Sequence, residues 1–298
     1  MSGAELSVVV PSVNGFADLR DALSALLRDP PDVRLDVIVV ERCGETVRRQ
    51  VREMFPSVRL IEVDKNVTIP AMRAMAFDAA TAPAVAVIED HVIVPPGWAR
   101  GMLNALGAGD RVVGGAVENS ATSTTLDWAA FLCEYSHCLP PLTSGSVEWL
   151  TGNNVVYPRA LLERFRTAVH EGRWENYLHD QFRLHGVTLD CHPEIVVGHK
   201  KHYTFGEYLS QRYLYARSYA GARVTGASPA KRAVYGLAAM ALPPLLFYRT
   251  VSRIMSKGRY RGWLLKSIPL ISVFVVAWGL GEVTGYWRGA GNSLSRVC

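Results

Sequence analysis

Three adjacent polar side chains, Glu89, Asp90 and His91, follow the apolar run at residues 84–88. Each of them can bind a divalent cation or accept a proton. Ligands of open α/β sheets lie beyond the carboxyl ends of the strands, so a polar triplet at such an end is a candidate site for chemistry. A strand that ends in a solvated acidic turn is the alternative that the triplet alone leaves open.

The elements that would position this triplet alternate along the first part of the chain. The predicted strands are 6–10, 35–40, 58–63 and 84–89, and the predicted helices between them are 17–27, 45–54 and 70–80. Short connections between such elements predict βαβ units and a mainly parallel sheet with helices on both faces. Ser12, Asn14 and Glu41 also follow predicted strands, so we expect this edge of the sheet to bind a ligand.

Composition and missing motifs exclude several classes of protein. The net charge of +5 comes without a dense Lys/Arg run, which argues against a nucleic-acid partner. No GxGxxG follows the first strand and no GxxxxGK[ST] occurs, which argues against a dinucleotide-binding domain and a P-loop NTPase. The cysteines form no CxxC pair and the N-terminus has no apolar signal core, so we expect reduced thiols and a cytoplasmic catalytic part. These cysteines are Cys43, Cys133, Cys138, Cys191 and Cys298.

The order of the polar strand ends resembles that of family 2 glycosyltransferases with the GT-A fold, over about residues 6–221. The Pro-Ser-Val-Asn at 11–14 resembles the Pro-Thr-Tyr-Asn that ends the opening strand of the family. Glu41 resembles its acidic contact to the nucleotide base, Arg73 its helix arginine near the diphosphate, and 152–154 its Gly-x-Asn strand beneath the donor sugar. The resemblance therefore implies donor contacts by Pro11, Ser12, Asn14, Glu41, Arg73, Glu89, Asp90, Asn153 and Asn154.

The triplet departs from the Asp-x-Asp motif of the family, because Glu89 and His91 occupy its two aspartate positions. In that motif a divalent cation stabilises the charge that develops on the leaving nucleoside diphosphate. Mg²⁺ prefers oxygen ligands, whereas an imidazole favours Mn²⁺. We expect Mn²⁺ or Mg²⁺, and the resemblance implies the ligands Glu89, Asp90, His91 and His199. The alternative is that His91 contacts the diphosphate directly and no metal is bound.

Inverting transfer needs a carboxylate that takes the proton of the acceptor as its oxygen attacks the sugar. The family places this base in an acidic pair that opens a helix upstream of a glycine. Aligned backwards from Gly186, that position falls on Glu175, while Asp180 follows a histidine in a pair that also looks like the motif. The two residues point about 140° apart on a helix, so they cannot both face one sugar. We predict Glu175 as the base, with Asp180 as runner-up or as an ion-pair partner of Arg183.

The last part of the chain contains two apolar segments, at 234–248 and 262–281, and only the second is long enough to span a bilayer. The basic segment 249–261 between them contains no acidic residue, and such loops stay in the cytoplasm. At least one segment should therefore lie in the membrane interface or re-enter. We predict a GT-A catalytic domain over 1–225 and a membrane-associated helical region over 226–298. Two buried helices of a soluble domain are the alternative.

These observations together predict an inverting, metal-dependent glycosyltransferase that acts at the cytoplasmic face of the cytoplasmic (inner) membrane. It would move a sugar from a nucleotide-sugar donor to an acceptor, with a lipid or lipid-linked molecule as a candidate. One alternative is a non-catalytic nucleotide-sugar-binding or scaffold protein of the same fold. Another is a nucleotidyltransferase, but that class would need a glycine-rich basic loop where residues 11–14 stand.

Overall fold

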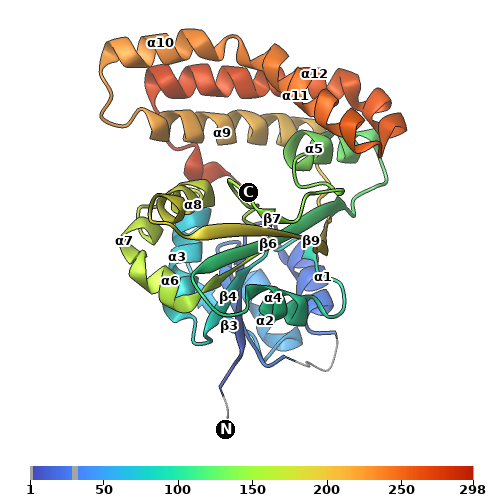
Figure 1. Ribbon diagram of the computed structural model, residues 1–298, viewed down its shortest axis with the longest axis vertical. Coiled ribbons are helices and arrows are strands. Elements are labelled where there is room, and N and C mark those ends of the chain that lie inside the picture. Colours follow the sequence, from blue (N-terminus) through green and yellow to red (C-terminus); the bar gives the residue numbers. More distant parts are fainter. Residues whose placement is uncertain (1–2, 29–32, 298) are drawn as a thin grey trace. The chain divides into compact units, whose positions relative to one another are not determined.

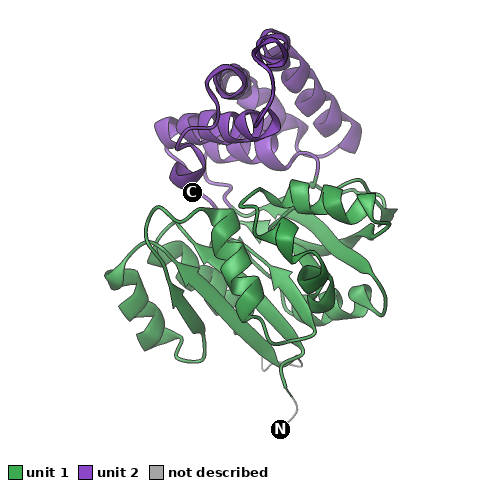
Figure 2. Ribbon diagram, turned by 90° about the vertical axis from the view of Figure 1, so that its left-hand side faces the viewer, with its two compact units in different colours: residues 1–120, 138–200 green, residues 121–137, 201–298 purple. Residues whose placement is uncertain are grey.

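The computed structural model describes residues 3–28 and 33–297 and divides into two compact units, which Figure 2 colours separately. Unit 1 comprises Met1–Ser120 and Cys138–Lys200, and unit 2 comprises Ala121–His137 and Lys201–Cys298. Unit 2 thus includes two segments upstream of the predicted boundary at residue 225. Cys298 and the first two residues of the N-terminal segment lie outside the described residues.

Unit 1 is built on one mixed sheet, which in the described part of the chain has the order β3-β2-β1-β4-β8-β6-β9-β5, with β7 paired to β9. The strands are β1 (Leu6–Ser12), β2 (Leu35–Glu41), β3 (Arg59–Glu62), β4 (Ala84–Val87), β5 (Val92–Ile93), β6 (Arg111–Asn119), β7 (Gly145–Ser146), β8 (Val155–Pro158) and β9 (Thr188–His199). The first four in spatial order run parallel, while β8 is antiparallel to β4 and β6. The carboxyl ends of β1, β2 and β4 therefore meet at one edge.

Helices cover both faces of this sheet (Figure 1). They are α1 (Phe16–Leu26), α2 (Glu45–Met54), α3 (Ile69–Ala79), α4 (Trp98–Leu106), α6 (Arg159–Arg164), α7 (Arg166–Val169) and α8 (Glu175–Leu184). Local sequence fixes the start of α3, because the Thr68 hydroxyl accepts a hydrogen bond from the Ala71 N–H and Pro70 lies in the first turn. The predicted α/β alternation is confirmed.

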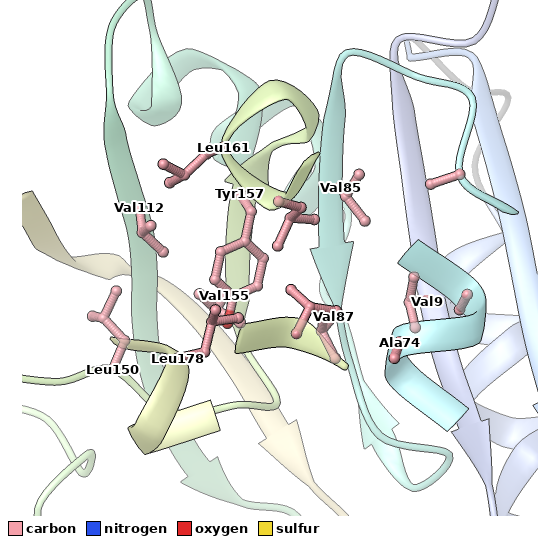
Figure 3. Packing of buried hydrophobic residues seen from close by; sticks show 14 of the residues in the cluster. Val9, Ala74, Val85, Val87, Val112, Leu150, Val155, Tyr157, Leu161 and Leu178 are labelled. Atoms are coloured by element: carbon pink, nitrogen blue, oxygen red, sulfur yellow. The ribbon is translucent and has the colours of Figure 1, made fainter. Parts of the chain in front are cut away.

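One face of the sheet packs against α3, α6, α7 and α8 in a continuous apolar core. Val9, Val87 and Tyr157 of the strands lie in this core, and Figure 3 shows them beside Ala74 of α3 and Leu178 of α8. Alternate residues of each strand point to the opposite face. The buried side chains of α8 therefore hold its first turn, where Glu175 lies, at a fixed place over the sheet.

Unit 2 is helical in the part of the chain that the structure describes. Its elements are α5 (Thr125–Tyr135), α9 (Phe205–Arg223), α10 (Pro229–Ala239), α11 (Leu242–Lys257), α12 (Arg261–Arg288) and the short 3-10 helix η1 (Leu294–Arg296). Two glycines let α12 approach α9 closely: a Cβ at Gly281 would lie 2.4 Å from the Tyr213 carbonyl oxygen, and one at Gly285 would lie 2.6 Å from that of Arg217. This packing explains why α9 belongs to unit 2.

The two apolar segments of the sequence form α10 to α12. The first is broken between α10 and α11, which are bent by 50°, and Pro243 lies in the first turn of α11. Among the described helices, α12 alone is long and apolar enough to cross a membrane, and 44% of its apolar window is buried within the protein. Large apolar side chains are nevertheless exposed on these helices. They are Val234, Tyr235, Leu237, Met240, Leu245, Tyr248, Met255, Leu265, Val273, Val276, Leu280 and Trp287.

Candidate active site

The loops that follow β1 and β4 are joined through Asp90. Its Oδ2 accepts hydrogen bonds from the backbone N–H groups of Val13 (2.7 Å) and Asn14 (2.9 Å), and its Oδ1 accepts one from Asn14 Nδ2 (2.7 Å). Burial alone would raise the pKa of Asp90, but hydrogen bonds from His91, Asn14 and Val13 outweigh it and lower the pKa. Both oxygens of Asp90 are therefore committed to protein groups. The structure does not bring Asp90 into the metal-binding set predicted for it.

His91 lies between this anchor and two further ligand groups. Its Nδ1 is 2.9 Å from Asp90 Oδ1, while its Nε2 is 2.9 Å from His199 Nε2 and 3.4 Å from Glu89 Oε2. The antiparallel pairing of Val92 with His199 places β9 beside the triplet. A long-range strand pairing thus brings His199 to the end of β4.

Glu89, His91 and His199 form a cluster that can hold a cation, because one ligand atom from each lies within 4.8 Å of the others. One carboxylate and two imidazoles make a mixed oxygen and nitrogen set that suits Mn²⁺ and other transition metals better than Mg²⁺. A carboxylate on the far nitrogen of a ligating histidine fixes its orientation, and Asp90 has this position relative to His91. The residues of the cluster therefore fit a divalent cation.

The charges of this cluster are strongly coupled. Burial would lower the pKa of His91, but its hydrogen bonds with Asp90 and Glu89 raise it to about 10. Burial would raise the pKa of Glu89, but His91, Arg73 and His199 lower it to about 2. Because a metal-bound imidazole must be neutral, a cation at this site would displace the proton of His91.

Arg73 connects the cluster to Glu175. Its Nη1 lies 2.7 Å from Glu175 Oε2, and its Nη2 lies 3.8 Å from Glu89 Oε1. Gly152 leaves room for this pair, because a Cβ at that position would lie 2.6 Å from Glu175 Cδ and 2.9 Å from Arg73 Nη1. The Glu175 side chain is 23% exposed, so its carboxylate is in contact with solvent.

Asp180 lies elsewhere on α8. Its side chain is 61% exposed and pairs with Arg183 at 3.7 Å, whereas the buried side of the helix carries Leu178, His179 and Phe182. The structure thus brings Glu175 to Arg73 and leaves Asp180 on the helix surface, in the ion pair that was the alternative role for it.

The two asparagines after Gly152 differ in their contacts. Asn153 donates from Nδ2 to Glu89 Oε2 (3.1 Å) and so belongs to the cluster. Asn154 is fully buried, donates from Nδ2 to the carbonyl oxygens of Ala116 and Ile195 (2.9 Å each), and accepts a bond from the Trp98 indole. The amide of Asn154 thus links segments at the centre of the sheet. None of its polar atoms remains for the predicted contact with the nucleotide-sugar.

The residues at the ends of β1 and β2 are also buried. Glu41 accepts hydrogen bonds from the Gly44 N–H (3.0 Å) and from Arg48 Nε (2.7 Å), so its carboxylate fixes the loop after β2. Pro11 and Ser12 are buried at the end of β1, and the Ser12 Oγ has no hydrogen-bond partner among the described residues. Of this group, Ser12 retains a polar atom that a ligand could satisfy.

Two buried residues next to the Arg73 pair were not predicted. The Tyr157 hydroxyl lies 2.9 Å from His179 Nε2, and both side chains are enclosed in the core. Burial and the charge of Arg73 lower the pKa of His179 to about 3, so this imidazole stays neutral. The sequence places a histidine and an acid side by side at 179–180, and in the structure the histidine is the one that faces inward.

Comparison with known proteins now gives the site its context. The model of the family described as glycosyl transferase family 2 matches residues 7–164, which is more than half of the chain. The chain belongs to glycosyl transferase family 2. The predicted family resemblance is thus confirmed, and this family 2 chain carries the site at the polar strand ends. No curated protein matches it.

Two solved structures match this family 2 chain to different degrees. The mannosyltransferase PcManGT from Pyrobaculum calidifontis, solved with GDP-Man and Mn²⁺, has a TM-score of 0.57 and 14% identity, over 95% of this chain and 88% of that chain. TarS from S. aureus has a TM-score of 0.48 and 12% identity, over 71% of this chain and 39% of that chain. The first likeness, together with the family match, confirms the predicted GT-A fold.

Proposed function

We propose that this chain is an inverting glycosyltransferase that transfers a sugar from a nucleotide-sugar donor, with Glu175 as the general base. One observation carries the proposal: Arg73 contacts Glu175 at 2.7 Å and Glu89 at 3.8 Å, and so joins the candidate base to the candidate metal cluster. A donor whose diphosphate is held through a cation at Glu89, His91 and His199 would have its sugar directed toward Glu175. The solved structure with GDP-Man and Mn²⁺ supports this choice of ligands for the fold.

The residues of the site have distinct tasks in this reaction. Glu89, His91 and His199 would hold Mn²⁺ or Mg²⁺, which when bound stabilises the negative charge on the leaving nucleoside diphosphate. Glu175 accepts the proton of the acceptor hydroxyl as its oxygen attacks, and its ion pair with Arg73 fixes the direction of the carboxylate. Asp90 acts indirectly, because it orients the His91 ring.

For the acceptor we propose a lipid or lipid-linked molecule at the cytoplasmic face of the membrane, with unit 2 bound in the membrane interface. Two features support this: exposed apolar side chains on α10 to α12 and the basic segment 249–261. Apolar and basic groups on the same helices are typical of interfacial membrane binding. Each basic residue near anionic headgroups contributes about 1 kcal/mol.

The test is to screen a panel of nucleotide-sugars by thermal shift in the presence of Mn²⁺, then to follow turnover of the donor that stabilises the protein. We expect one donor class to raise the melting temperature and its sugar to be transferred to a lipid phosphate with inversion at the anomeric carbon, as read by NMR. A retained anomeric configuration would contradict the assignment of Glu175. Donor binding without transfer or hydrolysis would instead identify the non-catalytic alternative.

A further inference from the structure

Unit 2 contains a partly open cavity of about 620 Å³ among α5, α9, α10, α11 and α12. Small-molecule sites in proteins commonly have volumes of about 300–1,000 Å³, so this cavity can hold a ligand. All of its lining residues belong to unit 2, and none of them belongs to the cluster around Glu89. The catalytic proposal therefore leaves this cavity without a role.

The cavity is positively charged. Its charged lining residues are Arg212, Arg223, Arg249, Arg253, Glu134 and Glu282. His137 also lines it, and burial together with Arg253 and Lys257 lowers the pKa of this histidine to about 3, so it adds no charge. The arginines outnumber the carboxylates by two, which is the charge that one dianion would neutralise.

Part of this charge is paired within the protein. Arg223 lies 3.4 Å from Glu282 Oε2 and donates to the Tyr286 hydroxyl at 3.1 Å, which accounts for one arginine and one glutamate. Arg212 lies over the Trp278 ring at 4.1 Å from its centroid, and its buried Nε has no hydrogen-bond partner among the described residues. This Nε is shielded from the cavity, so a ligand would meet Arg212 through its terminal guanidinium nitrogens.

Arg249 and Arg253 lie one turn apart on α11 and both line the cavity. Residues four apart lie on the same side of a helix, so their guanidinium groups can act on one ligand, although Arg253 also donates from Nη1 to Ser136 Oγ (3.3 Å). Arginine forks match phosphate oxygens in pairs, which a lysine ammonium cannot do. Because arginine forks also match carboxylates, it is the excess of two positive charges that favours a dianionic phosphate monoester over a monoanionic carboxylate.

The remaining wall is apolar, with Leu242, Leu246 and Val275 among its residues. α11 also exposes Leu245 and Tyr248 on its outer surface. A ligand that satisfies both the arginines and this wall has a phosphate at one end and an apolar chain at the other. We propose that the cavity of unit 2 binds the phosphate monoester of an amphiphile, such as a lipid phosphate, independently of the donor site.

The test is calorimetric titration of the full chain in a non-ionic detergent, without nucleotide-sugar. The probes are dioctanoyl phosphatidate, dioctanoylglycerol and inorganic phosphate. We expect phosphatidate to bind and dioctanoylglycerol to bind at least about tenfold more weakly, since charge-assisted bonds to the phosphate supply the difference. Inorganic phosphate that binds as tightly as phosphatidate would overturn the amphiphile as the ligand, because the apolar wall would then contribute nothing, and would assign the free ion instead.

Variants identify the residues that bind the probe. Arg249→Gln/Arg253→Gln should raise the Kd for phosphatidate by about tenfold or more, whereas Arg288→Gln, which is exposed and does not line the cavity, should leave it unchanged. Leu246→Trp should weaken phosphatidate binding and spare inorganic phosphate, because it fills the apolar part only. Equal binding of dioctanoylglycerol, or unchanged binding by the double arginine variant, would overturn the proposal. Because no donor is present, this result is separate from the outcome of the transfer assay.

Discussion

Arg73 Nη1 lies 2.7 Å from Glu175 Oε2, although 102 positions separate the two residues in the chain. The same guanidinium lies near Glu89, so the positive charge of one buried arginine contacts both the candidate base and the candidate metal cluster. Such a shared partner fixes the distance between the two groups, which is what a transfer between a held donor and an approaching acceptor requires.

Replacing the candidate base should stop transfer while leaving the donor bound. Glu175→Gln keeps a hydrogen-bond acceptor beside Arg73 but cannot take a proton, so we expect kcat to fall by about 10²–10⁴-fold with little change in donor affinity. The rate of sugar transfer and the thermal shift by the donor measure the two quantities. Asp180→Asn is the matched control on the same helix, and it should retain wild-type turnover because Asp180 is exposed and pairs with Arg183. Loss of activity in the control alone would reverse the assignment.

Asp90→Asn should weaken metal binding although Asp90 lies outside the set of converging ligand atoms. The Asn amide has one acceptor oxygen, whereas Asp90 uses two. One accepts hydrogen bonds from two backbone N–H groups, and the other contacts His91 Nδ1. Loss of a carboxylate partner of a ligating histidine typically costs about 10–100-fold in metal affinity. Titration of Mn²⁺ by electron paramagnetic resonance measures this change. Asp110→Asn, at an exposed carboxylate that pairs with Arg164, should bind Mn²⁺ as the wild type does.

His179 should make the fold sensitive to acid. Its folded pKa of about 3 lies below its ordinary value of 6.5, so between these values the unfolded state binds a proton that the folded state does not. The free energy of unfolding is therefore highest above pH 6.5 and falls with decreasing pH, by up to about 2 kcal/mol at pH 5. His179→Gln, which can still bond Tyr157, should remove this loss in urea unfolding at pH 7 and pH 5. The control His185→Gln changes an exposed histidine and should keep the wild-type pH dependence.

Binding to anionic membranes should depend on the basic residues between the apolar helices. Lys257→Gln/Arg261→Gln removes two charges that do not line the cavity, and we expect it to weaken binding by about 2 kcal/mol, or about thirtyfold. Co-sedimentation with phosphatidylglycerol vesicles at low salt measures the change. Arg166→Gln/Arg183→Gln makes the same charge change in unit 1 and serves as the control. Equal loss in both variants would show that net charge, and not unit 2, governs attachment.

The sequence predicted most of the sheet because its strands are apolar runs of β-branched residues bounded by polar turns. The position of Glu89 at a strand end also followed from the apolar run before it, whereas Glu175 was chosen by aligning its segment with the family motif. His199 reaches the cluster only through the pairing of β5 with β9, and the sequence placed it there solely by resemblance. Contacts between strands far apart in the chain leave no periodic signal.

The roles of individual polar residues were harder to predict than their locations. Asp90 and Asn154 have the residue types of ligand-binding groups, yet the polar atoms of both are bonded to backbone and side-chain groups of the protein. The boundary between the units was also hidden, because α9 is polar overall and its association with α12 depends on Gly281 and Gly285. Close helix packing through small residues does not alter hydrophobic periodicity.

The most direct test of the central claim is turnover of the identified nucleotide-sugar with Mn²⁺ and with a chelator, in the wild type and in His199→Asn. If Glu89, His91 and His199 hold the cation that binds the donor diphosphate, the wild type transfers sugar with Mn²⁺, stops in chelator and recovers when Mn²⁺ is restored, while His199→Asn needs a higher Mn²⁺ concentration. Equal turnover in Mn²⁺ and in chelator, with no effect of His199→Asn, would contradict the claim.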